Sequence, residues 1–238
     1  PRDSEQSADY ISSLDGLAGD SRPIVFAPIA ALTHAVVSPA DLRSSIRRVG
    51  IRDILSMSDL ASWASSTGYE HSTVVQRVGE YARRGGIVDI FSPGARGPVR
   101  IEFFGDDVDS IRTFDPDSQR SLERLDAIRL MPALELPVWR LKQVPDRFPN
   151  IQSADLRTEV REELERTLDR AGAGSIPATL DMFAPMLLER PTSLLDHLPD
   201  DAVVIWDEPD AIRLAGEQRD IHARDHYHAA RSSGELPA

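Results

Sequence analysis

The 238-residue sequence predicts an α/β fold in which a small α+β domain interrupts a larger domain. An apolar run at residues 23–27 leads directly into a helical pattern at 29–37, which is half of an α/β unit. Short β-like runs separated by turn residues fill residues 86–130, and a second apolar run at 202–206 ends in two acidic residues. The expected bounds are 1–45 and 134–238 for the larger domain, and 46–133 for the inserted domain.

The first segment is predicted to form helix, strand and helix in that order. Tyr10, Leu14 and Leu17 recur at helical spacing before the apolar run at 23–27. Ser38 and Pro39 mark a turn or helix start, and residues 41–48 continue the helical pattern.

The inserted domain is expected to begin with a helix and continue as strands. Ser56 is a candidate N-cap for a helix over residues 59–66, with Leu60 and Trp63 on its inner face. The loop at 92–98 is rich in proline and glycine, so it should connect two antiparallel strands. The strand-like runs are 86–91, 99–104, 108–114 and 127–130.

The remainder is predicted to be mostly helical. Residues 155–170 form a solvated helix whose apolar stripe is narrow. The run at 202–206 has the composition of a buried strand, and a polar helix follows from residue 209. The members of the narrow stripe are Leu156, Val160, Leu164 and Leu168.

Composition limits the possible functions. Hydrophobic residues make up 41% and charged residues 28%, as in folded, soluble proteins. The absence of cysteine excludes disulfides, thiol catalysis and cysteine-bound zinc. No apolar run approaches the roughly 20 residues that span a bilayer, so we expect no membrane contact. A net charge of −12 argues against tight DNA binding, because that affinity grows with basic contacts to phosphate.

The stretch GEYARRGGIVDIF at residues 79–91, followed by PVRIEFFGDDVDSIR at 98–112, is the most specific part of the sequence. Alternation along a strand at 99–104 predicts one core face and a second, mostly polar face carrying Arg100 and Phe104. That second face has the composition of a binding hot spot. An alternative stays open, in which Phe104 covers a satellite core and the arginines pair with nearby acids. The candidate acids are Glu102, Asp106 and Asp107.

Together with FDP at 114–116 and SQRS at 118–121, these stretches resemble the UvrB interaction domain shared by UvrB and Mfd, the bacterial transcription-repair coupling factors. The ending is more similar to the Mfd branch, and flanking segments agree, so the resemblance covers nearly the whole chain. It implies the amino-terminal UvrB-like module of such a factor: a partial, degenerate helicase-like domain of P-loop type around the inserted domain.

The resemblance also implies a partner, the repair protein UvrA. The family's UvrA contacts fall on positions that match Arg84, Arg100 and Phe104. RNA polymerase would be contacted only through other parts of the parent protein. The expected location is the bacterial cytoplasm, in association with the nucleoid.

Catalytic, cofactor and metal sites are not expected. Asp207 and Glu208 follow a Walker-B-like run, but no G-x-x-x-x-G-K-[ST] loop exists and the only lysine, Lys142, lies outside any glycine loop. The two acids are therefore interpreted as vestigial. His222 and His226 stand at zinc-binding spacing on a helix, but a solvated histidine cluster is the favoured interpretation.

A metal-dependent nuclease is also disfavoured. Five carboxylates lie between residues 89 and 109, but Phe104 stands where such a site needs a lysine. These carboxylates are Asp89, Glu102, Asp106, Asp107 and Asp109.

The resemblance thus implies a non-catalytic module that recruits UvrA to stalled RNA polymerase in nucleotide excision repair. One alternative is a fragment of UvrB itself, which would bind ATP and damaged DNA. The other is a structural or autoinhibitory domain that masks its own surface in the parent protein.

Overall fold

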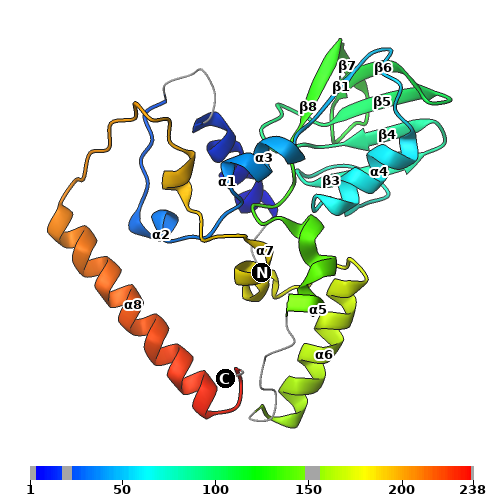
Figure 1. The fold of residues 1–238 in the computed structure, drawn as a ribbon. Helices are drawn as coiled ribbons and strands as arrows, with labels where there is room; N and C mark the ends of the chain where they lie inside the picture. The colour runs from blue at the N-terminus through cyan, green and yellow to red at the C-terminus, as the bar shows by residue number, and fades with distance from the viewer. Residues whose placement is uncertain (1–3, 18–22, 148–155, 237–238) are drawn as a thin grey trace.

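The computed structural model describes residues 4–17, 23–147 and 156–236, which form two β-sheets with most of the helices to one side of them (Figure 1). The mixed α/β class expected from the sequence is confirmed. The α-helices are α1 Ser4–Leu17, α2 Ile29–Leu32, α3 Pro39–Ser45, α4 Met57–Ser66, α5 Val144–Arg147, α6 Thr158–Gly172, α7 Ala184–Leu187 and α8 Pro209–Ser232. The short 3-10 helices are η1 Val138–Gln143, η3 Leu180–Phe183 and η4 Leu194–His197.

The strands are β1 Arg47–Gly50, β2 Glu70–His71, β3 Glu80–Arg84, β4 Ile87–Ile90, β5 Val99–Phe104, β6 Asp107–Phe114, β7 Ser121–Arg124 and β8 Ala127–Leu130. Six of them form one sheet in the order β2-β3-β4-β5-β6-β7, and β1 pairs with β8 separately. All neighbours are antiparallel except β2 and β3. The loop at 92–98 joins antiparallel β4 and β5, as predicted.

Helix α4 covers one face of the six-stranded sheet (Figure 1). Ser56 caps the helix, because its hydroxyl accepts a hydrogen bond from the Asp59 amide at 3.0 Å. Leu60 is fully buried and Trp63 partly buried against the sheet, which confirms the predicted inner face. The strand residues beneath α4 are Tyr81, Val88, Ile90, Val99, Ile101, Val108 and Ile111.

The chain on either side of the sheet packs around two further cores. One is formed by α1, α3 and η4, where Ile11, Leu14 and Leu42 are buried. Ser38 caps α3 by accepting from the Asp41 amide at 3.1 Å. The prediction that this helix reaches residue 48 is wrong. Ile46 takes an extended conformation and the chain continues as β1, which buries Val49 and pairs with β8.

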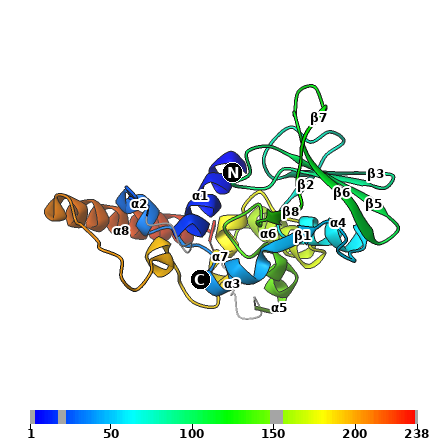
Figure 2. The same cartoon turned by 90° about the horizontal axis from the view of Figure 1, so that it is seen from above.

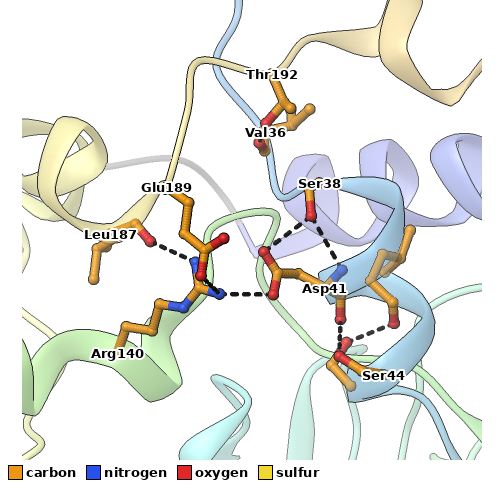
Figure 3. Close-up of polar contacts among 10 residues, drawn as sticks. Val36, Ser38, Asp41, Ser44, Arg140, Leu187, Glu189 and Thr192 are labelled. Atoms are coloured by element: carbon orange, nitrogen blue, oxygen red, sulfur yellow. Dashed lines mark hydrogen bonds and ion pairs between the residues drawn. The ribbon is translucent and has the colours of Figure 1, made fainter.

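The other core lies among η1, α5, α6 and α7, and Arg140 ties it to α3 (Figure 3). The Arg140 guanidinium donates to Asp41 Oδ1 at 2.7 Å, to Glu189 Oε1 at 3.0 Å and to the Leu187 carbonyl at 3.1 Å. One arginine therefore joins Asp41 and Glu189, which lie about 150 residues apart in the sequence.

Helix α8 projects away from the rest of the molecule beside α2 (Figures 1 and 2). Of its 24 residues only Ala230 is buried, which agrees with the polar helix predicted from residue 209. The end of the chain returns to the start of α6, where Arg157 and Glu235 form an ion pair at 2.8 Å. Helix α6 was predicted at 155–170; its first predicted residue lies outside the described residues.

The two strands predicted at 23–27 and 202–206 are absent. Both runs are extended but pair with no other strand, and their apolar side chains face solvent, with Phe26 92% and Ile205 84% exposed. A strand of this composition is stable only between neighbours that satisfy its backbone and cover its side chains. Because the described residues provide no such neighbours, they contain no parallel sheet of the expected helicase-like type.

Candidate docking surface

The motif at 79–112 forms the four adjacent strands β3 to β6, so its residues lie side by side in one sheet. Arg84 pairs with Ile87, and Ile87 pairs with Glu102 on β5. The turns at Gly85 and Gly105, both with positive φ, therefore lie at the same end of the sheet, which we call the distal end. Gly86 permits this arrangement, because a Cβ there would lie 3.1 Å from the Phe103 carbonyl oxygen.

Phe104 is exposed at the distal end. Phe103 packs against the core under α4, so Phe104, the next residue on the strand, projects from the opposite face. It pairs with Asp107 and its exposed fraction is 81%. The alternative in which Phe104 covers a satellite core is therefore wrong.

Arg84 is exposed on the same sheet face. Two strand spacings, about 10 Å, separate its backbone from that of Glu102. Its guanidinium donates one hydrogen bond to the Thr73 carbonyl and has no carboxylate partner among the described residues. Arg84 thus presents a positive charge without a carboxylate partner among the described residues, on the same sheet face as Phe104 and two strands away from it.

Arg100 does not join this exposed surface, which corrects the prediction of one exposed patch formed by all three residues. Its Nε and Nη2 donate to the two carboxylate oxygens of Asp89, each at 2.8 Å. Its guanidinium also lies 4.8 Å from the centre of the Phe114 ring, and its side chain is only 19% exposed. The hydrogen bond with Asp89 raises the pKa of Arg100 above its ordinary value. The side chain is therefore always charged, and it is largely buried on its face of the sheet.

A short segment before α4 completes the distal end. The Arg52 amide donates to the Val108 carbonyl at 2.8 Å, and the Leu55 amide donates to the Asp106 carbonyl at 2.7 Å. Ile54 forms an antiparallel bridge with Asp107. Leu55 is buried in the core, whereas Ile54 is 86% exposed.

Ile54 was not among the predicted site residues. A usable signal did exist, because neighbouring residues of an extended segment point to opposite faces. Of the adjacent apolar pair Ile54 and Leu55, one must therefore face away from the core.

These residues form a surface that we call the distal patch: Ile54, Arg84, Glu102, Phe104 and Asp107. Its charges are mixed. Glu102 accepts from the Ser110 hydroxyl at 2.5 Å, whereas Asp107 has no ion pair among the described residues. The patch is an end of a sheet with protruding side chains, a shape suited to protein contact.

A groove of about 550 Å³ lies elsewhere on the same domain. It runs between the loop at 92–98, β7 and β8, and Leu122 and Leu125 are among its apolar lining residues. Arg129 at its rim is already paired with Asp15 at 2.5 Å. The groove is separate from the distal patch, because none of the patch residues lines it.

Asp207 and Glu208 occupy an irregular, exposed turn before α8. Glu208 has a left-handed φ of 53° and does not cap the helix with its side chain. The predicted geometry, two acids at the end of a buried strand, is therefore wrong.

Metal binding has no geometric support in the part of the chain that the structure describes. No group of three or more histidine, aspartate or glutamate side chains there is arranged to hold a metal ion. His222 and His226 are exposed on α8. Likewise, no helix among these residues is long and apolar enough to cross a bilayer.

The distal patch belongs to a domain of known family: residues 49–136 match the model of the UvrB interaction domain. Over 225 residues, or 90% of the chain, the sequence is 33% identical to the transcription-repair-coupling factor of Bacillus subtilis. It is 30% identical to that of Escherichia coli over 82% of the chain, and 38% identical to that of Myxococcus xanthus over 50%. The chain is thus a homologue of transcription-repair-coupling factors over most of its length.

The chain spans only a part of these relatives. It covers 19% of the Bacillus subtilis protein and 17% of the Escherichia coli protein. The resemblance inferred from the central motif is confirmed, because the UvrB interaction domain matches residues 49–136 and transcription-repair-coupling factors match most of the chain.

Proposed function

We propose that this chain is a non-catalytic docking module that recruits UvrA in transcription-coupled repair. The observation that carries the proposal is the exposure of Arg84 and Phe104 on one face at the distal end of a UvrB interaction domain. Phenylalanine supplies desolvated contact area and arginine pairs with carboxylates through its planar fork, a combination that concentrates binding energy.

In this proposal Arg100 acts indirectly. Its pairing with Asp89 holds β4 against β5 and thereby fixes the position of Phe104 four residues further along the strand. Arg84 and Phe104 make the contacts with UvrA.

The test compares two exposed arginines on the same domain. Arg84→Ala should weaken UvrA binding about tenfold, since a residue in a binding hot spot contributes more than ~1 kcal/mol. Arg96→Ala is the matched control, because Arg96 is also exposed but lies on the loop at the opposite end of the sheet. Binding of purified UvrA is measured by calorimetry. Equal affinities for the two variants would place the docking surface elsewhere.

The proposed module performs no chemistry. Lys142 lies on η1, where its side chain packs beside Gly174, and the sequence has no other lysine. We expect no saturable binding of ATP in equilibrium dialysis with Mg²⁺, and only weak, salt-sensitive binding to DNA. ATP binding at micromolar concentration that is lost in Asp207→Ala would instead support the UvrB-like alternative.

In the parent protein, translocation on DNA and contact with RNA polymerase would belong to segments outside this chain. The module would work in the bacterial cytoplasm, where it presents to UvrA the surface that UvrB also uses.

A further inference from the structure

The distal patch has a second exposed apolar side chain that neither the family motif nor the proposed function uses. Ile54 and Phe104 both pair with Asp107, one from each side. Paired residues of antiparallel strands project from the same face. The three side chains therefore form one row, and the two apolar members are 86% and 81% exposed.

A regular antiparallel pairing of β5 and β6 would place Asp107 on the core face of the sheet. The register between β5 and β6 shifts at Glu102 and Phe103, so that Glu102 pairs with Ser110 whereas Phe103 pairs with Val108. Asp109 is the extra residue, and it restores Asp107 to the exposed face. Without this bulge Asp107 would point toward the core and the row would not exist.

We infer that Ile54 is a second apolar anchor for UvrA, alongside Phe104. The inference rests on the proposed function, because it assigns a further contact on the same surface. The backbones of Ile54 and Phe104 lie two strand spacings apart, about 10 Å, with the Asp107 carboxylate between them. Each side chain therefore fills its own hollow on the partner.

The charges of the patch define the rest of the complementary surface. Asp107 is exposed and has no ion pair among the described residues, so its carboxylate is available to a basic group on the partner. Arg84 lies on β3, at the opposite side of the patch from Asp107, so an acidic group of the partner faces it there. A UvrA surface with this alternation would be recognised by its charge pattern as well as by its apolar contacts.

The fold does not bury the Ile54 side chain, so packing within the domain does not explain an isoleucine at this position. Hydrogen bonds hold the backbone on both sides of Ile54. The Asp53 carbonyl accepts from the Val108 amide at 3.0 Å, and the Leu55 amide donates to the Asp106 carbonyl. The side chain is therefore presented on a fixed backbone, which reduces the entropy lost when a partner binds.

The experiment titrates UvrA into the wild-type chain and into Ile54→Ala, Ile54→Leu, Phe104→Ala and Leu122→Ala. Leu122, 66% exposed on the edge strand β7, is the control for an exposed apolar residue outside the patch. We expect Ile54→Ala to raise the Kd about tenfold, Ile54→Leu to restore most of the affinity, and Leu122→Ala to have no effect. Thermal unfolding should show the same midpoint for all the Ile54 variants.

Two results would overturn the inference in distinguishable ways. If Ile54→Ala binds like the wild type while Phe104→Ala binds weakly, Ile54 is not an anchor and the proposed function stands. If the wild-type chain does not bind UvrA, both the inference and the proposed function fail.

Discussion

At the scale of single residues, Arg100 was assigned to the correct face of the strand, but the prediction that it is exposed there is wrong. Alternation along β5 places it with Phe104 on the face away from α4, as the sequence predicts. Its partner, Asp89, lies across the strand pair, and only the register of β4 against β5 brings the two together. The fork that was expected to reach a partner protein is already occupied.

This pairing makes Arg100 a stability residue. Asp89 is 3% exposed, so Arg100→Ala would leave a buried carboxylate without its partner. We expect the free energy of unfolding to fall by about 3–5 kcal/mol in urea denaturation. Arg84→Ala should change it by less than ~0.5 kcal/mol, because Arg84 is exposed.

The double variant Asp89→Ala/Arg100→Ala separates pairing from packing. It should be more stable than the sum of the two single changes predicts, because it leaves no buried charge behind. Additive losses would show that the ion pair is unimportant to the fold.

His197 gives the fold a pH dependence. Its ring is buried, and Nε2 lies 2.9 Å from the Val37 carbonyl. Burial lowers its pKa below the ordinary value of about 6.5, and Arg43 adds to this effect, although the carbonyl and Asp196 favour the charged form. The unfolded chain therefore takes up the proton at higher pH than the folded chain, so stability falls as pH drops below about 6.5.

The measurement is urea unfolding at pH 5.5 and pH 7.5. The wild-type chain should lose more stability between these values than His197→Gln, whose amide still donates to the Val37 carbonyl but does not titrate. Equal losses in the two proteins would assign the acid sensitivity to other groups.

At the scale of elements, the sequence predicts a helix or strand correctly where its local pattern agrees with the packing in the structure. The predicted run at 99–104 matches β5, the run at 127–130 matches β8, and Ser56 caps α4 as expected. Strands β1, β2, β3 and β7 were not among the predicted runs. Residues 47 and 48 of β1 were assigned to a helix, and β2 has only two residues. All of β7 is exposed, so it lacks the apolar alternation that marks a strand.

The failure at 202–206 has a different cause. Its apolar composition specifies a buried strand only if other strands lie beside it. Whether such neighbouring strands exist depends on the rest of the molecule, so the pattern of residues 202–206 alone does not predict it. The same reasoning applies to the run at 23–27.

Hydrogen exchange tests this account of the two runs. The amides of residues 24–26 and 203–206 have no hydrogen-bond acceptor among the described residues, so they should exchange at close to unprotected rates. The β5 amides, which lie between β4 and β6, should be protected by several orders of magnitude. Protection of 203–206 equal to that of β5 would show that this run is paired.

At the scale of the whole molecule, the described residues form a six-stranded sheet, a separate two-stranded sheet and a set of helical segments. The six-stranded sheet has its core on the α4 side, and the proposed docking surface lies at its distal end. The net charge of −12 disfavours nucleic acid as the main partner of the chain. The face that carries Phe104 was predictable from the alternation along the strand, whereas the exposure of its side chain stayed open between a binding surface and a satellite core. The bulge that aligns Asp107 with Phe104 and Ile54 was not predictable, because it depends on pairing between strands.

The central claim is that the distal patch docks UvrA, and the affinity of Phe104→Ala for purified UvrA tests it most directly. Phe104 is 81% exposed, so its removal should leave the thermal midpoint unchanged while the Kd rises about thirtyfold, as expected for a hot spot of ~2 kcal/mol. Arg96→Ala provides the reference for a surface change outside the patch. A Phe104→Ala chain that stays folded and binds UvrA with wild-type affinity would contradict the claim.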